Sequence, residues 1–143
     1  FLSTKFMQKR LPLIMEAVVG AGVPHCVLMS AYGVGDTVRS ASFLMRVACK
    51  TIMRSIFRDR AKADAMVAKY QPYISRALPG RLTDEPGKGG AKVVDVTSVA
   101  HVPGIPTIAR EDVADALLDI AGDPLNAGTD FLVTIEDVVI RAA

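Results

Sequence analysis

Short apolar segments alternate with longer helix-forming segments along this chain, and that alternation restricts the fold more than any other feature. Short runs bounded by turn residues predict buried strands at residues 25–29, 73–78 and 131–135. Helical patterns precede or separate these runs, over residues 1–21, within 42–69 and over 110–121. Strands that alternate with helices form parallel units joined by right-handed crossovers. The sequence therefore predicts an α/β fold.

The remaining segments complete this prediction. Residues 91–96 predict a short extra strand, the stretch up to Pro106 is expected to be irregular, and a last helical turn is expected near Ala143. One face of the first helix collects apolar side chains, namely Phe6, Leu13, Ile14, Ala17, Val18 and Ala21. We expect one domain over residues 1–143, with about three parallel strands, the short extra strand, and helices on both faces.

The composition restricts the class of protein. Half of the 143 residues are apolar and 22% are charged, which excludes an intrinsically disordered chain. The two cysteines, Cys26 and Cys49, cannot form a disulfide framework, so a reduced intracellular chain is expected. No apolar run reaches the roughly 18 residues of a membrane span, and the N-terminus has no signal-peptide core. We expect a cytoplasmic protein that does not enter a membrane.

Common catalytic and metal-binding motifs are absent from the sequence. Ser30 lies between Met29 and Ala31, which excludes the G-x-S-x-G turn of a hydrolase nucleophile. The histidines and cysteines form no C-x₂-C or H-x₃-H pair, so we expect no metal site. Neither a Walker loop nor a complete G-x-G-x-x-G motif is present.

The carboxyl ends of the first two predicted strands are more informative. Open α/β sheets bind ligands outside the carboxyl ends of their strands. Here those ends are followed by Ser30–Gly33 and Leu78–Thr83, which combine polar groups with glycine backbone. The two segments predict a ligand-binding edge, but glycine and proline also simply end strands. The residues alone leave both interpretations open.

Five basic residues, here called the basic series, recur every four positions: Arg46, Lys50, Arg54, Arg58 and Lys62. On one helix they form a single stripe, in which like charges repel by roughly 0.2–0.5 kcal/mol per pair. Such a stripe suits a phosphate, a nucleic acid or an acidic partner. We favour the alternative, a solvated face beside a separate apolar stripe. No helix-turn-helix or zinc module is visible, so sequence-specific DNA binding is not expected.

Four segments, taken in order, are VLMSAYG (27–33), RDRAKAD (58–64), LPGRLTD (78–84) and IAREDVA (108–114). Together they resemble the C-terminal half of NAD(P)H-binding atypical short-chain dehydrogenases. The nearest relatives are the flavin reductase/biliverdin-IXβ reductase type and the NmrA-like proteins. The resemblance covers roughly Ala17 to Val133, in the order and spacing of that family.

This resemblance implies the second half of a Rossmann-like parallel sheet and a cofactor, NADP or NAD, with NADP slightly favoured. It implies that Ser30, Ala31 and Tyr32 lie beside the nicotinamide, with Ser30 and Tyr32 as the catalytic candidates. It also implies that the nicotinamide end is held by the backbone of Leu78, Pro79, Gly80, Arg81 and Leu82.

Arg60 falls about where the helix of this family faces the cofactor. A guanidinium on the buried side of a helix needs an anionic partner. That partner is either the cofactor or a nearby carboxylate, Asp59 or Asp64.

One departure from the family concerns its chemistry. The Tyr-x-x-x-Lys dyad of typical short-chain dehydrogenases is absent. Without that phenol, ordinary alcohol oxidation is disfavoured, and an NAD(P)H-dependent oxidoreductase that passes hydride to a small acceptor such as a flavin or quinone is favoured. The alternative is a non-catalytic NmrA-like regulator or binding module that keeps the fold.

A second departure concerns the cofactor's pyrophosphate. Relatives begin with a glycine-rich strand–turn–helix unit whose helix N-terminus binds that group, and this βαβ unit is missing from the sequence. We expect either the C-terminal portion of a longer protein, which we favour, or a half-domain that needs a partner.

A half-sheet leaves one apolar strand edge unpaired, and such edges associate with other chains. We therefore expect residues 1–143 in isolation to self-associate or aggregate through that edge. Sedimentation over a range of protein concentrations measures this, and a stable, soluble monomer would contradict it.

Overall fold

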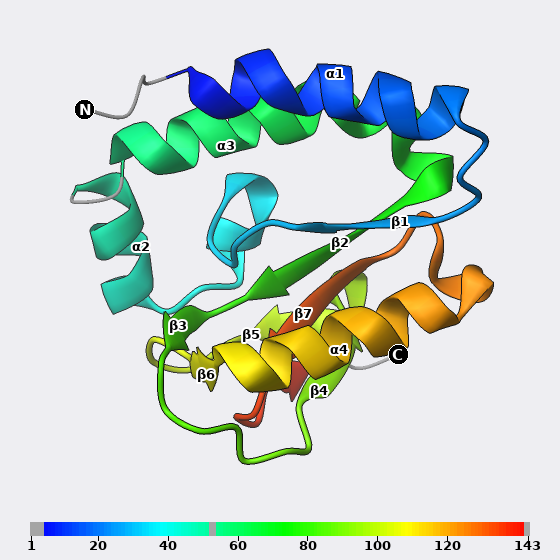
Figure 1. The fold of residues 1–143 in the computed structure, drawn as a ribbon. Helices are drawn as coiled ribbons and strands as arrows, with labels where there is room; N and C mark the ends of the chain where they lie inside the picture. The colour runs from blue at the N-terminus through cyan, green and yellow to red at the C-terminus, as the bar shows by residue number, and fades with distance from the viewer. Residues whose placement is uncertain (1–4, 52–53, 142–143) are drawn as a thin grey trace.

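Helices and strands alternate in the structure (Figure 1). The computed structural model describes residues 5–51 and 54–141. The α-helices are α1 (Phe6–Gly20), α2 (Phe43–Lys50), α3 (Arg54–Val67) and α4 (Arg110–Gly122). The strands are β1 (Cys26–Met29), β2 (Ile74–Pro79), β3 (Arg81–Thr83), β4 (Lys92–Asp95), β5 (Val99–His101), β6 (Thr107–Ala109), β7 (Asp130–Thr134) and β8 (Val139–Ile140). Short 3-10 helices are η1 (Gly35–Arg39), η2 (Ala68–Tyr73), η3 (Val96–Ser98) and η4 (Pro124–Asn126).

A four-stranded sheet in the order β1-β2-β7-β4 forms the centre of the molecule. β2 runs parallel to both β1 and β7, with Met29 opposite Ala77 and Leu78 opposite Leu132. β4 pairs with β7 in the antiparallel direction. This arrangement confirms the predicted α/β class with a mainly parallel sheet. β1 is an edge strand with no neighbour on its outer side within the described residues.

Helices cover both faces of this sheet, with α1 and α3 on one face and α4 on the other (Figure 1). Successive side chains of a strand point to opposite faces. In β2, Ile74 packs with α1 and α3, whereas Ala77 packs with α4. In β7, Phe131 and Val133 join the α4 side, and Leu132 faces away from it. Burial of such side chains, worth about 1.5–3 kcal/mol for each large one, holds the layers together.

The segment 42–69, predicted as one long helix, forms two helices instead. α2 ends at Lys50, with Thr51 as its C-cap residue, and α3 begins at Arg54. The two helices run in different directions (Figure 1). The basic series is therefore divided between them, and the prediction of a single helical stripe is wrong.

The prediction also misses several short strands. The stretch before Pro106, expected to be irregular, contains β5, and β6 starts directly after this proline. β5 pairs with β8, which lies where a last helical turn was expected, and β3 pairs with β6. Ala143 lies outside the described residues. Each short strand pair provides hydrogen bonds between backbone N–H and C=O groups, which in an irregular loop would have to bond to water instead.

The buried face of α1 differs from the predicted one as well. α1 buries Leu11 and Met15, whereas Phe6, Leu13 and Ile14 are more than half exposed. Apolar residues occur on several sides of this helix, so periodicity alone does not select one face. Contact with α3 selects it. Within the described residues no helix, α1 included, is long and apolar enough to cross a membrane.

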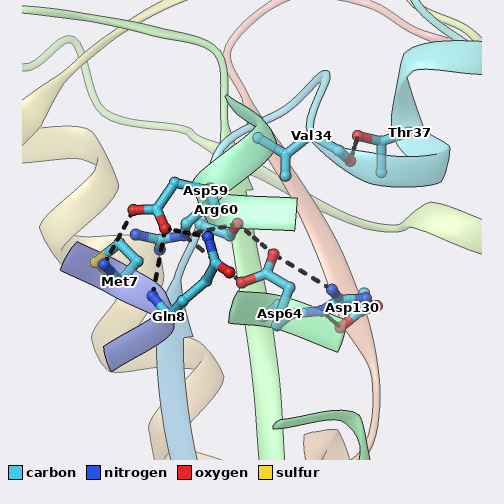
Figure 2. A network of polar contacts seen from close by, with 10 residues as sticks. Met7, Gln8, Val34, Thr37, Asp59, Arg60, Asp64 and Asp130 are labelled. Carbon is cyan, nitrogen blue, oxygen red and sulfur yellow. Dashed lines mark hydrogen bonds and ion pairs between the residues drawn. The ribbon is translucent and has the colours of Figure 1, made fainter. Parts of the chain in front are cut away.

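A carboxylate on α3 caps the start of α1. Lys5 occupies the N-cap position and offers no side-chain hydrogen bond to the first amides. Asp59 of α3 accepts from the amides of Met7 at 3.0 Å and Gln8 at 3.4 Å, and from the Gln8 side chain at 2.8 Å (Figure 2). A negative charge at this position also meets the positive end of the helix dipole. Asp59 therefore fixes α1 on α3.

The charge of this cap makes the stability of the fold depend on pH. Burial alone raises the pKa of Asp59, but the hydrogen bonds from Gln8 and Met7, together with the charge of Arg60, hold the pKa below its usual value. A carboxyl with a lowered pKa in the folded state contributes stability above its unfolded pKa. That contribution is lost as the pH falls through the folded pKa.

We expect Asp59→Asn to lower the free energy of unfolding by about 1–2 kcal/mol at neutral pH, because a neutral amide is the weaker cap. Urea unfolding at a series of pH values measures this, and the gap to wild type should narrow below about pH 4. Asp115→Asn, at an exposed position of α4, is the matched control and should change little. A gap that stays constant down to acid pH would contradict the assignment.

Candidate functional site

Ser30 directly follows β1 at its carboxyl end, and its side chain joins a buried polar network. Its amide donates to the Ala77 carbonyl oxygen at 2.8 Å, which extends the pairing of β1 with β2. Its hydroxyl donates to Asp64 Oδ2 at 2.8 Å and accepts from Arg60 Nε at 3.2 Å. The structure therefore brings together two residues that the sequence predicts at the site, Ser30 and Arg60.

Asp64 is the centre of this network and is only 5% exposed. Its Oδ1 lies 3.6 Å from Arg60 Nε, one turn earlier on α3, and its Oδ2 lies 3.4 Å from Arg76 Nη1 on β2. Arg76 then donates two hydrogen bonds to Asp130 of β7, the one from Nε measuring 2.9 Å. Figure 2 shows Asp64 on the side of Asp130, away from Asp59. The network joins α3 to all three parallel strands.

Charges of opposite sign alternate along the network. The hydrogen bond to Asp130 raises the pKa of Arg76 above its usual value, although burial acts in the opposite direction. Burial lowers the pKa of Arg60, and the carboxylates of Asp64 and Asp59 oppose that effect. Arginine stays protonated in proteins, so both guanidiniums are cationic. Each buried charge thereby has a partner, without which its burial would cost several kcal/mol.

Two groups of the network, Arg60 and Ser30, keep hydrogen-bonding capacity for a ligand. Asp64 Oδ1 accepts no hydrogen bond either, but it is fully buried. Arg60 bonds within the described residues only through Nε, and its side chain is 20% exposed. The Ser30 hydroxyl donates its one hydrogen bond to Asp64, accepts one from Arg60, and keeps one more lone pair. The network can therefore hold a ligand that donates a hydrogen bond to Ser30 and accepts one from Arg60. Within the described residues no His, Cys, Asp or Glu cluster could hold a metal ion.

A cavity of about 570 Å³, a size typical of small-molecule sites, lies beside the network. Three charged residues of the network, Asp64, Arg76 and Asp130, line it. The other lining residues are of both kinds: polar or charged ones at Asp36, Thr37, Arg39, Ser40, Gln71, Thr97 and Arg141, and small or aliphatic ones that include Val34, Gly35, Ala61, Ala65 and Leu78. The wall of the cavity is therefore about as polar as it is apolar.

Tyr32 supports the turn that follows Ser30 from inside the protein. Its side chain is 2% exposed, and its hydroxyl lies 2.9 Å from Ser40 Oγ. Its amide donates to the Pro79 carbonyl oxygen at 2.9 Å. Ala31, between Ser30 and Tyr32, is half-buried. The structure thus places Ser30 in the polar network and Tyr32 in the packing that holds the turn.

The segment predicted to hold the nicotinamide end consists of the end of β2 and of β3, joined at Gly80. A Cβ at Gly80 would lie 2.3 Å from the carbonyl oxygen of Pro106, so only glycine fits there. The Arg81 amide donates to that same oxygen at 2.8 Å. In this segment Leu78 and Pro79 are buried, Leu82 is half-buried and Arg81 is exposed. Through Pro79, the segment borders the turn at Tyr32.

Sequence reasoning identifies Ser30 and Arg60 but misses two members of the network. Asp64 is indicated only as an ion-pair partner of Arg60, at the i, i+4 spacing of a helix, and that pair is confirmed. Arg76 and Asp130 give no such signal, because they lie 54 residues apart. They meet because they are register partners in adjacent parallel strands.

A mainly parallel sheet covered by helices on both faces, with a polar network at its carboxyl edge, defines a Rossmann-like α/β protein. The sequence profile of NAD(P)H-binding proteins matches residues 3–124. The chain belongs to this NAD(P)H-binding family. A search of curated proteins found no significant match.

Solved structures share this fold at low sequence identity. ChuY from the E. coli CFT073 strain has a TM-score of 0.69 and 20% identity, over 89% of this chain and 64% of that chain. A short-chain dehydrogenase/reductase from Veillonella parvula DSM 2008, in complex with NADP, has a TM-score of 0.73 and 15% identity, over 92% and 59%. ChuY from E. coli O157:H7, described as an anaerobillin reductase, has a TM-score of 0.66 and 19% identity, over 89% and 57%. The chain spans less than two-thirds of the length of each of these structures.

We expect Asp64→Ala to lower the free energy of unfolding by about 3 kcal/mol, because it leaves two partly buried guanidiniums and the Ser30 hydroxyl without their shared acceptor. Urea unfolding at neutral pH measures this. The control is Asp36→Ala, which removes an exposed ion pair of the same type with Arg39, at 3.5 Å, and should cost less than about 1 kcal/mol. Equal losses of unfolding free energy in the two variants would show that the buried network stabilises the fold no more than an exposed ion pair does.

Proposed function

We propose that the protein is an NAD(P)H-dependent reductase of the atypical short-chain dehydrogenase type, and that this chain holds the nicotinamide end of the cofactor. Membership of the NAD(P)H-binding family supports the cofactor. The observation that carries the proposal is the contact of Ser30 with Arg60 and Asp64 at the carboxyl end of β1. NADPH is the preferred form in this proposal, and the Veillonella protein of similar fold was solved with NADP.

The hydrogen-bonding state of Ser30 suits the carboxamide of a nicotinamide. Its proton is directed to Asp64, so toward a ligand it acts only as an acceptor. The carboxamide NH₂ group is a donor and matches that requirement. In this proposal Ser30 orients the nicotinamide ring and does not itself supply a proton.

Arg60 suits the oxygen atoms that adjoin the nicotinamide. Its Nε donates to Ser30, and its terminal nitrogens donate no hydrogen bond to a described residue. They would donate to ribose or phosphate oxygens, as charge-assisted hydrogen bonds. Ala31 and Tyr32 would shape the turn beside the ring, and the backbone from Leu78 to Leu82 would close the opposite side.

The absent phenol restricts the acceptor. When bound, the reduced cofactor supplies a hydride. A carbonyl substrate would also need an acid to protonate the alkoxide that forms, and the chain has no Tyr-x-x-x-Lys dyad for this. A flavin or a quinone can take its proton from water. Such small electron-poor acceptors therefore suit this chain better than carbonyl compounds.

The pyrophosphate end of the cofactor needs a separate binding unit in this proposal. Residues 1–143 form one partial NAD(P)-binding domain and contain no glycine-rich phosphate turn. The glycine-rich βαβ unit would come from the same protein or from a partner chain. The outer edge of β1 is where such a unit, or a second copy, would continue the sheet.

We expect Arg60→Gln to raise the KM for NADPH about tenfold, since a charged hydrogen bond is worth about 1.5–3 kcal/mol. The assay is NADPH oxidation with a flavin or quinone acceptor, with the protein as its gene encodes it. Arg10→Gln, at an exposed position of α1, is the matched control and should leave KM unchanged. An unchanged KM in both variants would contradict the role of Arg60. NADPH binding without any turnover would favour the non-catalytic regulator instead.

A further inference from the structure

A second cavity, of about 540 Å³, is lined in part by the turn that follows Ser30. Gly33, Gly35 and Val38 form one wall of it. The other lining residues come from the end of α2 and the first turns of α3: Lys50, Arg54, Phe57 and Arg58. Three of the five members of the basic series therefore line one cavity, although they belong to two helices.

These three cations have no counter-ion within the described residues. Lys50, Arg54 and Arg58 are exposed, and none of them makes an ion pair with a described carboxylate. Other exposed arginines do have partners, as Arg39 has in Asp36 and Arg110 in Asp84. Like charges gathered at one opening repel, and a bound anion would relieve that repulsion.

Two apolar side chains line the cavity together with the cations. Phe57 and Val38 are partly buried and pack against the core cluster that contains Tyr32. The lining glycines add no side chains that would fill the space. An aromatic side chain in the same cavity as exposed cationic groups fits a flat apolar molecule that carries a phosphate or carboxylate group.

The position of the cavity connects it to the reaction site. Gly33 lies three residues after Ser30, and Arg58 lies two residues before Arg60. Gly35 lines both this cavity and the one beside Asp64. We propose that Lys50, Arg54 and Arg58 form an anion subsite that selects acceptors bearing a phosphate or carboxylate group. This inference rests on the proposed function and adds the charge class of the acceptor.

A pair of flavins tests the subsite directly. Flavin mononucleotide and riboflavin share one ring system and differ by a terminal phosphate. Quenching of flavin fluorescence gives both dissociation constants without NADPH. We expect the wild type to bind flavin mononucleotide about tenfold more tightly than riboflavin. We expect that preference to weaken as salt is raised, because ions screen exposed charges.

Two double variants separate the subsite from general surface charge. Arg54→Gln with Arg58→Gln should abolish the preference for flavin mononucleotide and leave riboflavin binding unchanged, which also shows that the fold is intact. Arg46→Gln with Lys62→Gln removes the same charge from the two members of the basic series that do not line the cavity. This second variant should keep the preference.

Equal affinities for the two flavins in the wild type would overturn the subsite, as would equal losses in the two double variants. Turnover of both flavins with the same KM would overturn it too, while leaving the proposed function in place. A preference for flavin mononucleotide that depends on Arg54 and Arg58, in a protein that oxidises no NADPH, would support the anion site and overturn the proposed function.

Discussion

The buried carboxylate of Asp64 is the interaction on which the rest of the structure depends. Taking a charge out of water is costly, and the fold compensates with a hydroxyl and two guanidiniums. Those partners come from the end of β1, from α3 itself and from β2, and Arg76 extends the chain of charges to Asp130 on β7. One side chain thus sets the position of α3 over three strands. Apolar packing between the same elements supplies bulk stability, but it does not specify position to this degree.

The same constraint gives Ser30 its chemical character. Because the hydroxyl donates its hydrogen bond to Asp64, it can act toward a ligand only as an acceptor, with the Arg60 guanidinium beside it. Tyr32 and Pro79 hold the following turn by a backbone hydrogen bond. Two cavities share Gly35, just after that turn, as a lining residue. A site whose groups are fixed before a ligand arrives loses less entropy on binding, which is how a structural network serves a functional site.

Features that depend on local chemistry could be predicted from the sequence, and features that depend on contacts between elements could not. The alternation of strands and helices predicted the fold class, and the turn residues after Met29 placed Ser30 at a strand end. The break after Lys50 has no proline or glycine to mark it, and the buried face of α1 is selected by contact with α3. The pairing of Arg76 with Asp130 requires the register of β2 and β7. The assignment of site residues to a cofactor stays a prediction.

A double-mutant cycle on NADPH affinity tests the central claim, that Asp64 acts on the cofactor through Ser30. The dissociation constant would be measured for the wild type, Ser30→Ala, Asp64→Asn and the double variant. If Asp64 orients Ser30, each single change weakens NADPH binding and the double variant is no worse than Ser30→Ala. That result corresponds to a coupling energy of about 0.5–3 kcal/mol. Losses that simply add, or an Asp64→Asn variant that binds NADPH as the wild type does, would contradict the account.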